Sequence, residues 1–157
     1  VETVRHDAFT LGAILERADK RDRLIGADSI AALPPGATVG TSAPRRAAQL
    51  LNQRPDCKVV MFRGNVATRL AKLAAGEADA TFLAAAGLER LGEHGVGHPL
   101  EVDHWLPAPS QGAIAVECRS DDEWSVHSTG GDECRDGNDY NFCGIGQEFT
   151  FNINCWR

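Results

Sequence analysis

The stretch that decides the fold is residues 39–70, which read VGTSAPRRAAQLLNQRPDCKVVMFRGNVATRL. It contains one pattern twice: a short apolar run, a polar turn and an amphipathic helical segment. A strand that feeds a helix in this way is typical of parallel sheets, where the turns after the strands meet at one edge and bind ligands. We therefore expect one crevice to hold the four arginines of these turns, namely Arg45, Arg46, Arg63 and Arg69.

The first turn has the composition of an anion site. Ser42 or Ala43 is the expected N-cap of the helix, and Pro44 suits its first turn. Arg45 and Arg46 follow in the same turn, where the helix dipole is already positive. A bound anion would offset this repulsion and use the free backbone N–H groups. The alternative is that the arginines pair with surface carboxylates. Four arginines at one edge favour a bound anionic ligand over this alternative.

Composition restricts the function classes. The chain has 157 residues, 43% of them hydrophobic, and a formal net charge of −6, which argues against nucleic-acid or membrane-surface binding. No segment resembles a membrane span or a signal peptide, and Cys57 and Cys118 are expected to be reduced core residues of a cytoplasmic protein. The histidines at 94, 98 and 104 lack metal-ligand spacing, so no metal is expected.

The remaining sequence predicts a small α/β domain. Strands are expected at residues 9–15, 24–25, 38–39, 58–62, 80–84 and 113–118, and helices at 44–52, 66–75 and 86–91. Asn65 is a potential cap of the second helix, Gly76 its C′ residue, and leucines 50, 51, 70 and 73 are expected to cover the sheet. The charge run at 16–23, taken alone, is typical of a solvated loop or short helix. Residues 107–112 are a hinge candidate.

Five blocks carry a resemblance to a known family. They are residues 16–22 (ERADKRD), 39–46 (VGTSAPRR), 63–70 (RGNVATRL), 83–91 (LAAAGLERL) and 106–113 (LPAPSQGA). Together they resemble the hydroxymethylbilane synthase family, also called porphobilinogen deaminase, over about residues 9–124. That resemblance implies a transferase of tetrapyrrole (haem and porphyrin) biosynthesis, which condenses four porphobilinogen molecules head to tail into hydroxymethylbilane and releases ammonia. It also implies a dipyrromethane cofactor and a monomer.

The pyrrole acetates and propionates make the cofactor and product polyanions, which guanidinium groups bind bidentately. The resemblance implies cofactor binding by Thr41, Ser42, Arg45, Arg46, Arg63 and Arg69, and substrate binding by Arg63, Arg69, Arg90 and Gln111. The alternative from another class is a non-catalytic anion-binding module for polycarboxylates or phosphates.

The resemblance also implies a domain map with a periplasmic-binding-protein-like fold and a mainly parallel sheet flanked by helices. Residues 1–17 would be a partial domain 1 and hinge, 18–106 domain 2, 107–124 a hinge and return strand, and 125–157 an atypical, irregular tail. The family usually has Ser-Leu at 43–44, Pro at 20 and Gly at 110, where this chain has Ala43-Pro44, Lys20 and Ser110.

Two functional residues of the family are not identified in this sequence. The general acid/base aspartate has no counterpart, since no motif before Phe9 matches it, so no catalytic residue is assigned. The cofactor-attaching cysteine has no matching motif either, although the tail contains Cys134, Cys143 and Cys155. The sequence therefore predicts little or no turnover by this chain alone.

Overall fold

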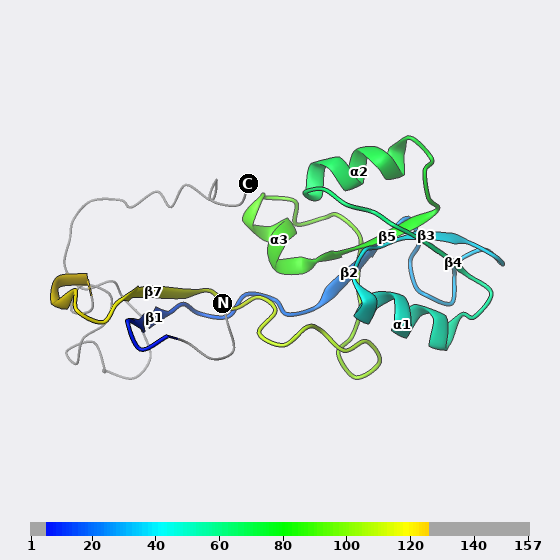
Figure 1. Cartoon of the computed structure of the whole chain (residues 1–157). Coiled ribbons are helices and arrows are strands. Elements are labelled where there is room, and N and C mark those ends of the chain that lie inside the picture. The colour runs from blue at the N-terminus through cyan, green and yellow to red at the C-terminus, as the bar shows by residue number, and fades with distance from the viewer. Residues whose placement is uncertain (1–5, 126–157) are drawn as a thin grey trace. The chain divides into compact units, whose positions relative to one another are not determined.

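The computed structural model describes residues 6–125, which fall into two units (Figure 1). The large unit is Arg17–Ala113. The small unit consists of the chain before the large unit together with the chain after it. Its described residues are 6–16 and 114–125. The tail expected from residue 125 onward, with its three cysteines, lies outside the described residues except for Ser125.

The large unit contains a five-stranded sheet with strand order β4-β3-β5-β2-β6. Its strands are β2 (Asp22–Ile25), β3 (Thr38–Gly40), β4 (Lys58–Val60), β5 (Ala80–Ala84) and β6 (His98–Pro99), and its helices are α1 (Pro44–Gln53), α2 (Val66–Ala74) and α3 (Ala85–Arg90). Strand β3 lies between β4 and β5 and pairs in parallel with both. Helices α1 and α2, which connect these strands, lie on opposite faces of the sheet (Figure 1).

The expected mainly parallel sheet is mixed instead. β2 pairs antiparallel with β5 and with β6, so the sheet has two parallel and two antiparallel pairings. The helical crossovers explain the difference, because they impose parallel direction only on the strands that they connect. β2 and β6 lie outside the β3-α1-β4-α2-β5 succession, and no such constraint acts on them.

Local signals at the helix ends are confirmed. α1 begins at Pro44, and its N-cap Ala43 makes no side-chain capping bond. The Asn65 side chain caps α2 by accepting a hydrogen bond from the Thr68 N–H at 2.9 Å. Gly76 follows the C-cap of α2 with φ +75°, a left-handed conformation that glycine adopts without steric cost.

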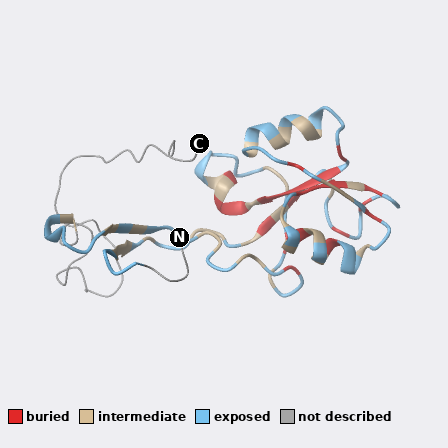
Figure 2. Ribbon diagram, in the orientation of Figure 1, coloured by how far each residue is buried: buried red, intermediate tan, exposed pale blue. Residues whose placement is uncertain are grey.

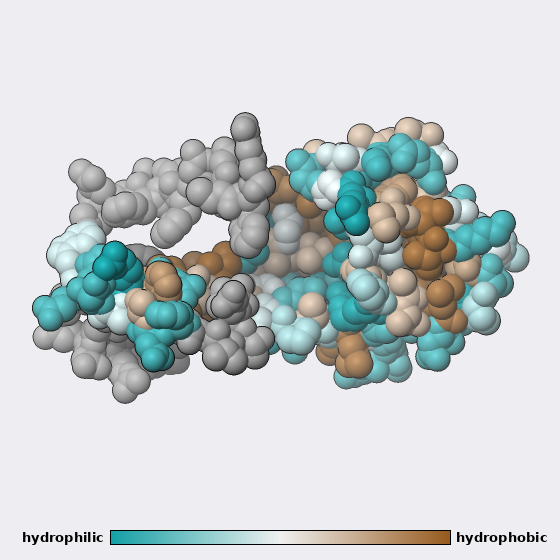
Figure 3. Space-filling model, viewed as in Figure 1, coloured by the Kyte–Doolittle hydropathy of each residue, from teal (hydrophilic) through white to brown (hydrophobic). Residues whose placement is uncertain are grey.

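The main core lies on the α1 side of the sheet. Its buried cluster includes Leu24, Val39, Leu50 and Trp105, whereas α2 has no buried residue. Figure 2 shows this burial concentrated along the strands. The prediction that Leu51 covers the sheet is wrong: it is exposed, because it lies about 100° around the helix from Leu50. In Figure 3, hydrophobic residues form a stripe among hydrophilic ones on the visible face of the large unit.

The small unit is a two-stranded antiparallel ribbon. β1 (Phe9–Ile14) pairs with β7 (Ala115–Arg119), and the register shifts between Leu11 and Ala13. The strand after the proline-rich connector therefore joins a different sheet from β2–β6. Cys118 in β7 and the buried Cys57 are both free thiols.

Ser110 is the one described non-glycine residue with positive φ, at +56°. Left-handed backbone costs a residue with a Cβ about 1–2 kcal/mol, which explains why the family usually has glycine here. We expect Ser110→Gly to raise the free energy of unfolding by about 1 kcal/mol in urea titrations followed by circular dichroism. Ala108→Gly, in the same segment without positive φ, should give no gain. An equal gain in both variants would contradict the strain argument.

Candidate anion-binding site

Thr41 and Ser42 join the two arginine-bearing turns. The Thr41 N–H after β3 donates to the Val60 carbonyl at the end of β4, at 2.9 Å. The Ser42 hydroxyl donates to the Phe62 carbonyl in the second turn, and the Thr41 hydroxyl accepts from the Ala43 N–H. Both predicted hydroxyl residues therefore hold the turns together at the carboxyl end of the parallel strands.

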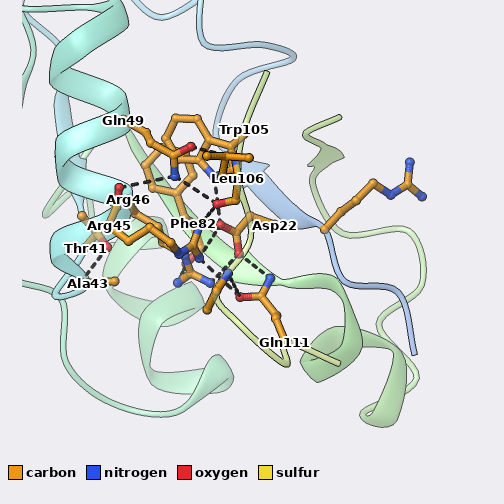
Figure 4. Close-up of polar contacts among 12 residues, drawn as sticks. Asp22, Thr41, Ala43, Arg45, Arg46, Gln49, Phe82, Trp105, Leu106 and Gln111 are labelled. Carbon is orange, nitrogen blue, oxygen red and sulfur yellow. Dashed lines mark hydrogen bonds and ion pairs between the residues drawn. The ribbon is translucent and has the colours of Figure 1, made fainter. Parts of the chain in front are cut away.

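Arg45 and Arg46 both bind the side chain of Asp22, the first residue of β2 (Figure 4). The Arg45 Nη2 lies 2.8 Å from Oδ2 of Asp22, and the Arg46 Nη2 lies 2.7 Å from Oδ1. The second Nη of Arg46 donates to the Phe82 carbonyl, and that of Arg45 donates to the Leu106 carbonyl. Arg46 is buried, whereas the Arg45 side chain is 24% exposed.

The expectation that the charge run at 16–23 is a solvated loop or short helix is wrong for Asp22. Its side chain is fully buried, two residues before Leu24 on the same face of β2. Residues i and i+2 of a strand lie on the same face of the sheet, so the apolar Leu24 was the sequence signal that could have predicted burial of Asp22. Burial alone would raise the pKa of the carboxyl. Hydrogen bonds and charge from Arg46, with bonds from Trp105 and Gln111, outweigh it, so the Asp22 pKa lies below its usual value.

Gln111 also binds inside this cluster. Its Nε2 donates to Oδ1 of Asp22 at 2.9 Å and to the Lys20 carbonyl at 2.7 Å, while its Oε1 accepts from Arg45 at 3.3 Å. The amide is thus already occupied by the chain's own groups. The carbonyl of the next residue, Gly112, accepts a hydrogen bond from Arg90. The predicted site residue Arg90 therefore contacts the segment that contains Gln111.

Arg63 and Arg69 keep more of their donors for a ligand. Arg63 is exposed, and no partner within residues 6–125 holds its side chain. Arg69 donates through Nε to the Gly64 carbonyl at 2.9 Å. Its pKa is lowered by burial and then by the charge of Arg46, so the second turn lies within the field of the first.

The arrangement carries excess positive charge. One buried carboxylate faces Arg45 and Arg46, and Arg69 lies in the same field. The first turn of α1 contains no acidic residue, and the buried Nε of Arg46 has no hydrogen-bond partner in the part of the chain that the structure describes. Such a site can bind anionic groups through charge-assisted hydrogen bonds. Within the described ranges no cluster of His, Cys, Asp or Glu could hold a metal ion, and no helix there is long and apolar enough to span a membrane.

Fold and site together define a mixed α/β domain with an arginine-rich candidate anion site at the carboxyl edge of its parallel strands. Comparisons with known proteins identify the family. The family described as "Porphobilinogen deaminase, dipyromethane cofactor binding domain" matches residues 1–127. The chain belongs to the porphobilinogen deaminase family.

Named relatives agree with this assignment. A porphobilinogen deaminase of Sphingopyxis alaskensis is 64% identical over 131 residues, covering 80% of this chain and 42% of the relative. That of Xanthomonas oryzae pv. oryzae is 54% identical over 125 residues, covering 78% and 41%, and that of Thermobifida fusca is 53% identical over 123 residues, covering 76% and 38%. The chain thus spans about two fifths of the length of these relatives.

One solved structure with a weak likeness is a putative L-cystine ABC transporter from Listeria monocytogenes. It is 14% identical, with a TM-score of 0.38, and the match covers 74% of this chain and 55% of that one. A likeness at this level does not bear on the fold.

Proposed function

We propose that this chain provides the carboxylate-binding part of a hydroxymethylbilane synthase, a transferase that condenses four porphobilinogen molecules into hydroxymethylbilane with release of ammonia. The observation that carries the proposal is the pair of arginine-bearing turns after β3 and β4. The two turns are joined by hydrogen bonds, and the arginines of the first turn bind a single buried carboxylate, that of Asp22. Membership of the porphobilinogen deaminase family supplies the substrate class. The ligands would be the acetate and propionate groups of pyrroles, whose geometry suits guanidinium groups.

The residues present fit a dipyrromethane cofactor. Within residues 6–125, Arg63 has unused donors, Arg69 uses only its Nε, and the buried Nε of Arg46 is unpaired. When bound, the cofactor would supply the pyrrole end from which the chain of substrates grows. Arg45, Arg63 and Arg69 would bind carboxylates directly, and Arg90 would border the same site. Thr41 and Ser42 would hold the turns together. Arg46 and Gln111, which bind Asp22, would support the site without contacting the ligand directly.

The proposal includes a domain arrangement. Residues 18–106 would form a domain of the periplasmic-binding-protein type, residues 107–124 a hinge and return strand, and residues 1–17 part of a first domain. The division of the chain near residues 16 and 113 supports this map. The chain would act as a cytoplasmic monomer. The acidic net charge supports the absence of nucleic-acid or membrane partners. Cys57 and Cys118, which form no disulfide within the described residues, support a reducing compartment.

Arg63→Ala and Arg69→Ala are each expected to weaken porphobilinogen binding about tenfold, measured by isothermal titration calorimetry. A hydrogen bond between charged groups is worth about 1.5–3 kcal/mol, and 1.4 kcal/mol corresponds to a factor of ten. Lys58→Ala is the matched control, because Lys58 begins β4 at the opposite end of the strand from Arg63. Unchanged affinity in both arginine variants would remove this site assignment.

The same titrations separate the enzyme from an anion-binding module. A module would bind inorganic phosphate or citrate as tightly as porphobilinogen, with the same losses in both arginine variants. Intact mass after incubation with porphobilinogen gives a second test. A mass increase in pyrrole increments would demonstrate covalent assembly on the chain itself.

A further inference from the structure

Asp22 is the only buried acidic side chain within residues 6–125. Its oxygens receive four side-chain hydrogen bonds: Oδ1 from Arg46 and Gln111, and Oδ2 from Arg45 and Trp105, at 2.7–2.9 Å. A carboxylate offers about four acceptor positions, so none remains for a ligand. Its pKa is also held below the usual value, which keeps it ionised. Asp22 therefore has neither a free lone pair nor a proton to contribute to a reaction.

The contacts of Asp22 instead determine where two cations lie. Both Nη atoms of Arg46 are occupied, one by Asp22 and one by the Phe82 carbonyl. Arg45 is held between Asp22, the Leu106 carbonyl and Gln111. These contacts fix two flexible side chains that would otherwise lose rotamer freedom on binding a ligand, and such preorganisation raises affinity.

Asp22 also sets the charge of the first turn. No acidic residue lies in the first turn of α1, so among residues 6–125 Asp22 supplies the only negative charge bound to Arg45 and Arg46. The cancellation is incomplete, because two guanidinium groups face one carboxylate and the charge of Arg46 still lowers the pKa of Arg69. The pair therefore keeps about one positive charge for a ligand carboxylate.

We propose that Asp22 is the positioning residue of the arginine site: it holds Arg45 in the orientation that binds a ligand carboxylate and takes no part in chemistry itself. This inference rests on the proposed function for the identity of the ligand. Asp22 lies in a different segment from the arginine turns, so it makes the site depend on the tertiary structure of the large unit.

Arg46→Met is the reference background for the test. Asp22→Asn alone would leave Arg46 buried without its anion and would threaten folding, whereas replacing Arg46 as well leaves no uncompensated buried charge at that position. In Arg46→Met, Asp22 keeps Arg45, Trp105 and Gln111 as donors. Adding Asp22→Asn then removes the negative charge that holds Arg45 and replaces one acceptor oxygen by an NH₂ donor.

The first readout needs no ligand. Phenylglyoxal modifies free guanidinium groups, and peptide mass spectrometry gives the rate at each arginine. We expect Arg45 to react about tenfold faster in Arg46→Met/Asp22→Asn than in Arg46→Met, since its ion pair becomes a weaker hydrogen bond to a neutral acceptor. Arg63, which is exposed in both, is the internal control.

The second readout is porphobilinogen affinity, for which positioning and long-range charge predict opposite signs. Asp22→Asn makes the site one unit more positive, so charge alone predicts tighter binding. Positioning predicts about tenfold weaker binding, because Arg45 is no longer held. A role limited to packing would leave both readouts unchanged, since Asn and Asp have the same shape.

An unchanged Arg45 rate would overturn the positioning role whether or not porphobilinogen binds. A faster rate with equal or tighter porphobilinogen binding would also overturn it. Failure of the unsubstituted chain to bind porphobilinogen would overturn the proposed function instead, and the Arg45 rate would then decide whether Asp22 positions the pair.

Discussion

Trp105→Ala is expected to lower the free energy of unfolding of the large unit by about 3–5 kcal/mol. The Trp105 ring is 2% exposed and stacks on Phe82 of β5, with centroids 4.8 Å apart and an interplanar angle of 26°. Its Nε1 donates to Oδ2 of Asp22 at 2.8 Å. The substitution therefore leaves a cavity in the core and removes a donor from a buried carboxylate.

Urea titration followed by circular dichroism measures this loss, and two further variants assign it. Trp105→Phe keeps an aromatic ring against Phe82 but has no N–H, so an intermediate loss is expected. Trp124→Ala should stay within about 0.5 kcal/mol of the parent chain, because Trp124 is 68% exposed. A loss below about 1 kcal/mol for Trp105→Ala would show that the core closes without this ring.

Gly112→Ala is expected to destabilise the large unit by about 2–4 kcal/mol, from two costs that add. Gly112 has φ +86°, which costs a residue with a Cβ about 1–2 kcal/mol. A Cβ there would also lie 2.5 Å from the carbonyl oxygen of Ala18, a backbone atom that cannot rotate away. Such overpacking typically costs about 1–3 kcal/mol.

Gly76→Ala separates the two costs. Gly76 has φ +75°, but a Cβ there would meet nothing within 4 Å, so a loss of about 1 kcal/mol is expected in the same urea titration. Because Gly112 accepts hydrogen bonds from the Ala18 N–H and from Arg90, its substitution should also disturb the connector beside Gln111. Equal losses for the two glycine variants would show that Ala18 moves aside freely.

Both predictions concern the segment that follows β6, and sequence patterns said little about its role. Residues 105–112 have no regular secondary structure, yet their side chains and carbonyls bind Asp22, Arg45 and Arg90. The sequence marked this segment through its prolines and through the resemblance. It did not reveal that Trp105 is buried against the arginine cluster, because a lone aromatic residue in a loop has no periodic signal.

The sequence by itself determined the local elements: the helices after the two arginine turns, the Asn65 cap, the left-handed Gly76 and the parallel pairing of β3 with β4 and β5. Capping, helical periodicity and crossover rules act over a few residues or one connection, so they can be recognised along the chain. The resemblance added the family.

Only the tertiary structure decided the antiparallel direction of β2, the burial of Asp22 and the internal pairing of Arg46 and Gln111. These features depend on contacts between distant segments, such as the hydrogen bond between Asp22 and Gln111, which lie 89 residues apart. Whether a charged residue is solvated or buried depends on which partners the fold brings to it, because a buried charge is tolerated only when it is paired. No local pattern around Asp22 contains those partners.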